Sequence, residues 1–198
     1  MKKIILLSIL SLFTSCAMGP LNGHETARTV GQGRNELVGG YGSASYVAKW
    51  TYGLSQNFDF GAHIEELSMG VRLKYALLNP RDGGVALALA GGAGASFGGS
   101  YYNGDILLSS LYGRIEPYAI FRYNHVTTDK QDFRDKDNGA INFTIDEASF
   151  TYGQVFLGSR VWLTQGFAVS VEASKLVRFE NVEFSDLIIV SGALIFRF

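Results

Sequence analysis

The chain has 198 residues but a single cysteine, only three prolines and no excess of charge of either sign. With one cysteine no disulfide can form within the chain, and one cysteine with three histidines gives little basis for a zinc site. Seventeen basic residues against 18 acidic ones leave a net charge of −1, without the basic excess of a nucleic-acid-binding protein. We therefore expect no metal, no cofactor and no nucleic-acid partner.

Long apolar runs are also missing beyond the first residues of the chain. The run from Ile4 to Phe13 follows two lysines and is too short to span a membrane as a helix. Residues 1–15 are therefore predicted to be a secretory signal peptide. Residues 16–34 are polar, contain several glycines and lack periodicity, so we interpret them as a linker that leads to the fold.

The exit from the apolar run carries a possible modification site. Thr14-Ser15-Cys16 resembles the lipobox of bacterial lipoproteins, although Phe13 departs from the usual aliphatic residue. The resemblance implies that Cys16 is acylated and becomes the mature N-terminus, and that the protein is sorted to the outer membrane, because Ala17 rather than an aspartate follows it. Ordinary signal cleavage after Ala17 is the alternative.

The sequence is rich in glycine and aromatic residues, and many of its segments alternate between apolar and polar residues. Its 24 glycines and 13% aromatic residues are typical of a sheet protein. Short alternating segments separated by turn residues predict ten strands, at 35–43, 46–54, 58–64, 69–78, 84–96, 104–113, 116–127, 148–162, 167–178 and 186–198. Short turns alternate with longer connections, the longest over 128–148, as in outer-membrane barrels whose short turns are periplasmic. We therefore predict an all-β fold over 35–198, a closed antiparallel transmembrane up-and-down β-barrel of about ten strands, with eight or twelve as alternatives.

The polarity of the two faces of each expected strand indicates which face meets lipid and which meets water. In 167–174, Val169 and Val171 share one face, whereas Ser170 and Glu172 share the other. A membrane barrel turns its apolar face to lipid and its polar face to the lumen. The charged and histidine residues predicted to line the lumen are Glu36, Lys49, Asp59, His63, Glu65, Arg72, Lys74, Glu116, Arg122, Arg160, Glu172 and Arg197. We expect them to form a network that fills the lumen; a narrow pore or a ligand site is the alternative.

Aromatic residues near the expected strand ends indicate two belts at the membrane interfaces. The belt at the short turns comprises Tyr52, Phe58, Tyr112, Tyr118, Trp162, Phe167 and Phe198. The belt at the longer connections comprises Tyr41, Tyr46, Tyr101, Tyr102, Tyr123, Phe150, Phe179 and Phe184.

The C-terminus carries the most specific pattern. Leu194, Phe196 and Phe198 alternate on one face up to the last residue, which resembles the C-terminal β-signal read by the outer-membrane assembly machinery. The wider pattern of residues 35–198 resembles small outer-membrane barrels of the OmpA, OmpX and OmpW type. The resemblance implies a monomer in the bacterial outer membrane, with membrane lipids and the assembly machinery as partners. The linker interpretation puts the N-terminus on the periplasmic side.

No motif identifies a ligand or a reaction, and the spacing of the acids in 129–139 does not match an EF-hand. We expect a structural or surface-interaction barrel that displays the long connection, and no enzyme. The alternatives are a narrow channel for small solutes, a lipid- or peptide-modifying enzyme that uses His125, and a lipid-anchored soluble barrel. The charged faces argue against the soluble barrel, which needs an apolar interior.

Overall fold

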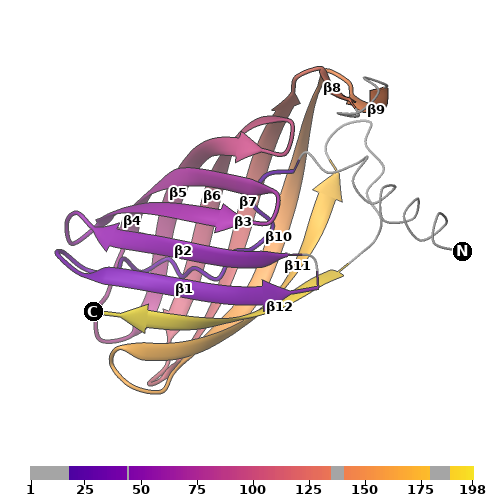
Figure 1. The fold of residues 1–198 in the computed structure, drawn as a ribbon. Helices are drawn as coiled ribbons and strands as arrows, with labels where there is room; N and C mark the ends of the chain where they lie inside the picture. Colours follow the sequence, from indigo (N-terminus) through magenta and orange to yellow (C-terminus); the bar gives the residue numbers. More distant parts are fainter. Residues whose placement is uncertain (1–17, 44, 135–140, 179–187) are drawn as a thin grey trace, which may run out of the picture.

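The structure, a computed structural model, describes residues 18–43, 45–134, 141–178 and 188–198. Ten strands form one closed antiparallel barrel in the order β1-β12-β11-β10-β7-β6-β5-β4-β3-β2 (Figure 1). The barrel strands are β1 Asn35–Gly42, β2 Tyr46–Gly53, β3 Phe58–Glu65, β4 Ser68–Leu78, β5 Gly84–Ser96, β6 Gly99–Leu111, β7 Ile115–Thr128, β10 Ala148–Trp162, β11 Phe167–Arg178 and β12 Ile188–Arg197. The predicted all-β, ten-stranded closed barrel is confirmed. No apolar helix of membrane-spanning length occurs among the described residues.

The first and last strands close the barrel. β1 pairs with β12 from Glu36 opposite Arg197 to Gly42 opposite Ser191. Beyond the strand ends, the Asn35 amide donates to the Phe198 carbonyl at 2.7 Å. Closure leaves no edge strand, which is the condition for placing a sheet in a bilayer.

The two ends of the barrel differ in their connections. At the short-turn end, β2–β3, β4–β5, β6–β7 and β10–β11 are joined by three to five residues, and both Asn35 and Phe198 lie there. The opposite end, which we call the long-loop end, carries the connection from β7 to β10, which contains the hairpin of β8 Gln131–Arg134 and β9 Ile141–Ile145. The expected alternation of short and longer connections holds only in part, because three residues join β1 to β2 and two residues each join β3 to β4 and β5 to β6, where the sequence predicted a longer connection over 97–103. This hairpin was not predicted, because four or five residues of mixed polarity give too short an alternation to be recognised.

One barrel strand differs from its expected bounds by more than two residues. β6 begins at Gly99, whereas the sequence placed its start at 104. The additional residues are polar or aromatic, and Tyr101 and Asn103 point inward, so no apolar outer face marks the beginning of the strand.

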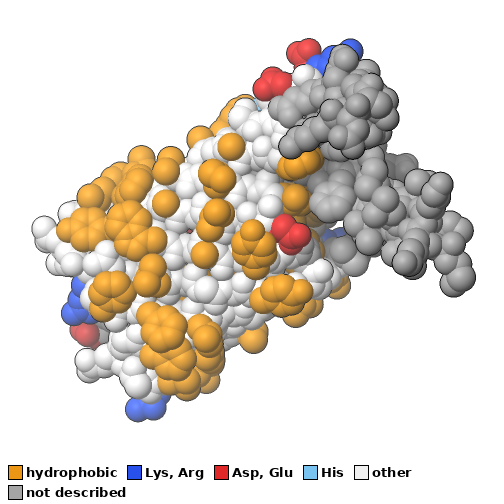
Figure 2. All heavy atoms as spheres, viewed as in Figure 1, with side chains coloured by type: hydrophobic (Ala, Val, Ile, Leu, Met, Phe, Trp, Pro, Cys, Tyr) orange, Lys and Arg blue, Asp and Glu red, His pale blue; other side chains and the backbone are white. Residues whose placement is uncertain are grey.

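The outer wall is apolar and the inner wall is polar. Val171 is 64% exposed on the outside, whereas the adjacent Ser170 and Glu172 are each 3% exposed. Orange hydrophobic side chains cover the barrel wall in Figure 2, and the coloured charges lie mostly toward its ends. This is the expected inversion of a soluble protein.

The aromatic belts need correction. Tyr101, Tyr118, Phe150 and Trp162 were expected in the belts but lie on the inner side of the wall. The polar atoms of three of them find partners there: Tyr101 bonds His63 at 2.7 Å, Tyr118 bonds Glu172 at 3.0 Å, and the Trp162 indole reaches Glu116 at 3.4 Å. Buried Tyr and Trp generally need such a partner, and a polar lumen supplies it. The other belt residues within the described ranges keep the outward register, and Phe179 and Phe184 lie outside those ranges.

Residues 18–34, expected to be part of a linker, enter the barrel and emerge at its short-turn end, where 32–34 are exposed; we call them the inner segment. Residues 19–31 are all buried except for the partly exposed Glu25. Their indigo trace in Figure 1 runs through the barrel from the long-loop end toward the short-turn end. Contacts agree with this path, because Asn22 bonds Ser45 between β1 and β2, whereas Gly33 bonds the last residue of β2.

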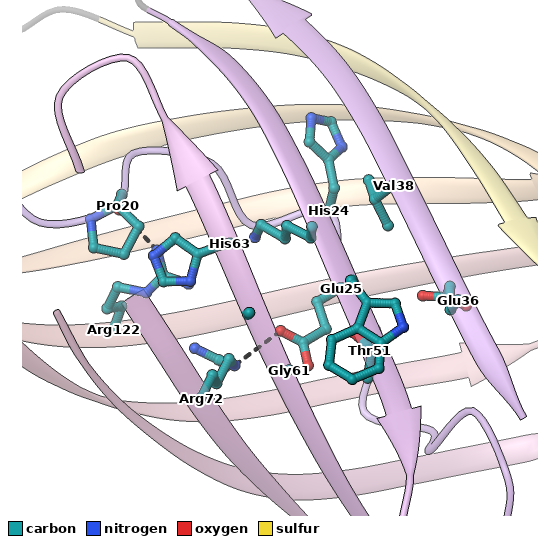
Figure 3. A pocket seen from close by; sticks show the side chains of 13 residues that line it. Pro20, His24, Glu25, Glu36, Val38, Thr51, Gly61, His63, Arg72 and Arg122 are labelled. Atoms are coloured by element: carbon teal, nitrogen blue, oxygen red, sulfur yellow. Dashed lines mark hydrogen bonds and ion pairs between the residues drawn. The ribbon is translucent and has the colours of Figure 1, made fainter. Parts of the chain in front are cut away.

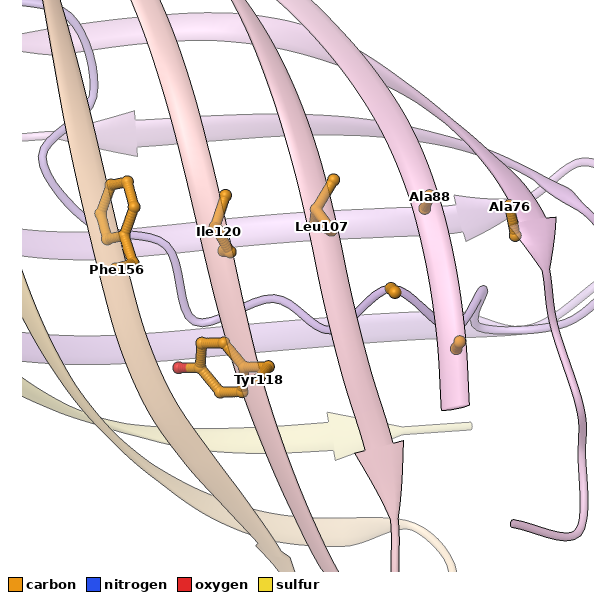
Figure 4. Close-up of a cluster of buried hydrophobic side chains, with 8 residues drawn as sticks. Ala76, Ala88, Leu107, Tyr118, Ile120 and Phe156 are labelled. Carbon is orange, nitrogen blue, oxygen red and sulfur yellow. The ribbon is translucent and has the colours of Figure 1, made fainter. Parts of the chain in front are cut away.

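The wall leaves room for the inner segment with small side chains. Ala27 packs in a buried cluster with Ala76, Ala86 and Ala88 on the inner faces of β4 and β5. The larger members of the cluster, on β6, β7 and β10, are Leu107, Tyr118, Ile120 and Phe156 (Figure 4). The small alanine side chains of β4 and β5, next to the bulkier ones of β6, β7 and β10, leave room for one extended chain within a ten-stranded barrel.

Candidate functional site

The interface between the inner segment and the wall is the candidate functional site. Near the long-loop end, the Glu65 carboxylate accepts hydrogen bonds from the Leu21 amide at 2.8 Å and the Asn22 side chain at 3.1 Å. Lys49 donates its ammonium protons to the carbonyls of Asn22 at 2.9 Å and Gly23 at 2.5 Å. Two opposite charges of the wall therefore hold the backbone of the segment by its donors and its acceptors.

Glu172 on β11 makes a second attachment at mid-height. Its two carboxylate oxygens accept the Gly23 amide at 2.7 Å and the His24 amide at 2.6 Å, and Tyr118 donates a third bond. A Cβ atom at position 23 would lie 2.4 Å from a Glu172 carboxylate oxygen, so any larger residue would displace this carboxylate from its present position.

His24 and its neighbours link the segment to the seam of the barrel. The two ring nitrogens of His24 lie 3.2 Å from the Ser170 hydroxyl and 2.9 Å from the Ser191 hydroxyl. Arg160 donates to the His24 carbonyl at 3.1 Å and forms an ion pair with Glu36 at 3.0 Å. These contacts connect β10, β11, β12 and β1 through one histidine of the segment.

Glu25 is the acidic side chain that the segment contributes to the wall's basic residues. It lies 3.0 Å from Arg72 (Figure 3) and 3.2 Å from Lys74. The same two cations also pair with Asp105 at 2.6 Å and Asp59 at 3.2 Å, respectively. A buried charge is tolerated only when it is paired, and Glu25 completes this arrangement.

At the short-turn end the segment supplies a cation instead. Arg28 pairs with Glu116 at 3.1 Å, and its guanidinium also donates to the carbonyls of Pro80 and Gly84. The Thr29 hydroxyl donates to the Gln56 carbonyl at 2.7 Å. The segment is therefore attached along its length, from Glu65 to Glu116.

All twelve residues that the sequence placed in the lumen lie on the inner face of the wall. The sequence missed Asp105, which bonds Arg122 at 3.1 Å from an inner wall position. The apolar Leu107 lies on the same face of β6 as Asp105, so the sequence did not show which residues of this strand point inward. The sequence also missed His24, Glu25 and Arg28 as lumen residues, because a segment without periodicity carries no sign of what surrounds it.

Little space is left between segment and wall. A cavity of about 20 Å³ lies beside His24, Glu25 and Lys49, which is room for about one water molecule. Within the described residues no group of three or more His, Cys, Asp or Glu side chains is arranged to hold a metal ion.

The remaining candidates lie elsewhere. His125 is on the outer face of β7, 3.1 Å from the Ser149 hydroxyl and 3.0 Å from the Thr151 hydroxyl, and no carboxylate bonds it within the described part of the chain. Leu194, Phe196 and Phe198 point outward on the closing strand, and their role in assembly stays a prediction. Cys16 lies outside the described residues.

No family model matches the sequence, and no curated protein matches it. Among solved structures, the N-terminal β-barrel domain of Pseudomonas aeruginosa OprF is similar at 14% identity, with 85% of this chain and 99% of that chain covered and a TM-score of 0.42. The NanC porin in a rhombohedral crystal form is similar at 11% identity, with 81% and 97% covered and a TM-score of 0.52. The likeness to NanC concerns the fold alone. Together with the closed ten-stranded sheet, it shows that this chain has the fold of an outer-membrane β-barrel.

Proposed function

We propose that the protein is an outer-membrane barrel closed by its own chain, which acts as a scaffold for its long-loop end and not as an open channel. The observation that carries the proposal is the inner segment itself, buried from residue 19 to residue 31 apart from Glu25. A channel needs a continuous aqueous path, and this path is occupied by polypeptide.

The attachment favours a permanent closure. Withdrawing the segment would strip Glu172 of two backbone donors and leave the cations around Glu25 with less negative charge. Hydrogen bonds to a charged group contribute about 1.5–3 kcal/mol each, and several would be lost together. Water entering the lumen would offset part of this loss, but the apolar contact of Ala27 would be lost as well.

Conductance in planar bilayers tests the closure. The full chain should give no unitary currents, whereas a variant that lacks residues 19–30 should conduct, because its charged lumen would fill with water. A variant that lacks residues 131–145, the region of β8 and β9, is the matched control and should be silent. Open-channel currents from the full chain, equal to those of the 19–30 deletion, would contradict the proposal and favour the narrow-channel alternative.

The orientation in the membrane is part of the same proposal. With the short turns in the periplasm, the segment enters the lumen from the cell-surface side, since Met18 packs beside Tyr101 and Tyr152 toward the long-loop end. This replaces the expectation that the N-terminal end of the fold is periplasmic. We retain acylation of Cys16 as a prediction, which mass spectrometry of the mature N-terminus would test.

Labelling of introduced cysteines tests the orientation. In intact cells, a membrane-impermeant maleimide should react with Lys130→Cys at the long-loop end and not with Gln32→Cys at the short-turn end; both positions are exposed. The single native cysteine, Cys16, offers no free thiol if it is acylated as predicted. After lysis both should react. The reverse pattern in intact cells would show that the long loops are periplasmic.

A further inference from the structure

A large hollow opens at the short-turn end, on the opposite side of the Arg28–Glu116 pair from the filled lumen. Its volume is about 800 Å³, within the usual range for small-molecule sites. It lies between the turns of that end and the last residues of the inner segment, 28–32, and Trp162 contributes to its wall. We call this hollow the vestibule.

The vestibule is strongly basic. Five arginines line it, against two carboxylates, Asp82 and Glu116, which leaves an excess of three positive charges in a chain whose net charge is −1. The arginines are Arg28, Arg34, Arg81, Arg114 and Arg197. They come from the inner segment, two different turns and the closing strand, so the fold gathers them from distant parts of the sequence.

Only two of the five arginines are neutralised. Arg28 pairs with Glu116 at 3.1 Å and Arg197 pairs with Glu36 at 2.6 Å. Arg34, Arg81 and Arg114 have no carboxylate partner among the described residues. Three guanidinium groups therefore border the hollow without an ion pair, and the remaining carboxylate of the lining, Asp82, is bonded to none of them within the described residues.

Arg81 is held in place by neutral groups alone. Its guanidinium donates to the backbone and side-chain oxygens of Gln56, both at 2.8 Å, and to the Thr29 hydroxyl at 3.1 Å. Gly31 lies between Arg81 and Arg34, since a Cβ built on it would be 3.3 Å from an Arg81 nitrogen and 3.7 Å from the Arg34 side chain. Partial burial, and then the positive charges of Arg197, Arg34 and Arg28, lower the pKa of Arg81, although Asp59 acts in the opposite direction. A fixed, preformed cluster of like charges is stabilised by a counter-ion.

We propose that the vestibule is a binding site for a soluble multivalent oxyanion, a small molecule with at least two phosphate or carboxylate groups. The planar fork of arginine matches both groups, and several forks around one hollow favour a ligand with several anionic groups over a single ion. The vestibule lies at the mouth of the lumen, inside the ring of turns, whereas bilayer lipids surround the outer wall. This position favours a soluble molecule over a lipid headgroup.

Binding would also act on the inner segment. Arg28, Thr29, Val30, Gly31 and Gln32 form part of the vestibule wall, so a ligand there rests against the end of the segment. Because a ligand that binds only the folded form stabilises it, occupancy should raise the unfolding temperature.

Calorimetric titration of the purified full chain in a zwitterionic detergent tests the site, with pyrophosphate and citrate as probes. The wild type should bind at least one of them with 1:1 stoichiometry, more weakly as salt is added. The double variant Arg34→Gln, Arg114→Gln should lose about tenfold in affinity per arginine, and Asp82→Asn should bind more tightly. Lys130→Gln, which removes one cation at the opposite end, is the matched control and should leave the affinity unchanged.

Three results would overturn the proposal: no binding of either probe by the wild type, equal affinity of the double variant and the wild type, or binding only to vesicles that contain phosphatidylglycerol. The last result would assign the arginines to a lipid surface. None of these measurements depends on conductance, so they are independent of the proposed closure of the lumen.

Discussion

Two stretches of this chain look alike in sequence and differ completely in the fold. The inner segment and the connection from β7 to β10 are both polar, lack a long apolar pattern and contain charged residues. The first is almost entirely buried, whereas Asp129, Lys130, Asp146 and Glu147 of the second are exposed. The difference lies in the surroundings, because the inner segment has a polar wall to bind, whereas the four charged residues of the connection named above face solvent.

The comparison shows that a polar sequence predicts solvent only where the interior is apolar. In this barrel the interior consists largely of paired charges, so a polar segment that places His24, Glu25 and Arg28 opposite suitable partners is better suited to burial than an apolar one. Most buried polar groups then cost little, because they find a partner; among the described residues Asn124 is an exception, with no hydrogen bond to either atom of its side-chain amide.

The largest effect should come from the inner wall. Arg160→Met would remove the partner of Glu36 and the donor to His24, and should destabilise the barrel by about 3 kcal/mol. The figure is at the low end for a broken buried pair because Arg197 still pairs with Glu36. Urea unfolding in lipid vesicles measures it. Lys130→Met on the outer connection should change stability by less than about 0.5 kcal/mol, and equal effects would remove the distinction drawn above.

A comparable or smaller effect, depending on depth in the bilayer, is expected on the outer wall, where lipid replaces the inner segment as neighbour. Val171→Arg should cost about 2–4 kcal/mol if the residue lies near the bilayer midplane and less toward the interface. Val171→Leu should be nearly neutral. The same unfolding assay in detergent micelles, where the thickness of the apolar layer adapts, should show a reduced penalty. An undiminished penalty in micelles would indicate that residue 171 packs against protein.

The smallest effect is local and concerns the attachment of the inner segment. Glu172→Gln should raise the hydrogen-exchange rates of the Gly23 and His24 amides by about tenfold, because a neutral acceptor replaces a charged one. The amides of β8 and β9 serve as internal controls and should be unaffected. Unchanged exchange at 23 and 24 would mean that packing, and not this carboxylate, holds the segment.

Most of the wall could be predicted because lipid outside and charged side chains inside require apolar and polar residues to alternate along each strand. The bounds of β5, β10 and β11 agree with the predicted ones, and the polar phase of β3 and β4 identified Asp59, Arg72 and Lys74 as lumen residues. Where an inner position is apolar, as at Leu107, the sequence does not show which residues of the strand face the lumen. Asp105 was missed for this reason. The inner segment could not be predicted, because its partners are scattered along the chain: Glu65 is 44 residues from Leu21, and Ser191 is 167 residues from His24.

These separations have a consequence for how the molecule is made. The inner segment is synthesised before any strand of the wall, and the wall is sealed by β12, the last strand, against β1. Once the barrel is closed, a chain could enter the lumen only from one end, and it would have to pass the side chains that bind the segment. Assembly by wrapping avoids this passage: the sheet grows around the segment and shuts last, with His24 already in reach of Ser191 on the closing strand. In such an order the inner segment serves as a template around which the strands of the barrel assemble.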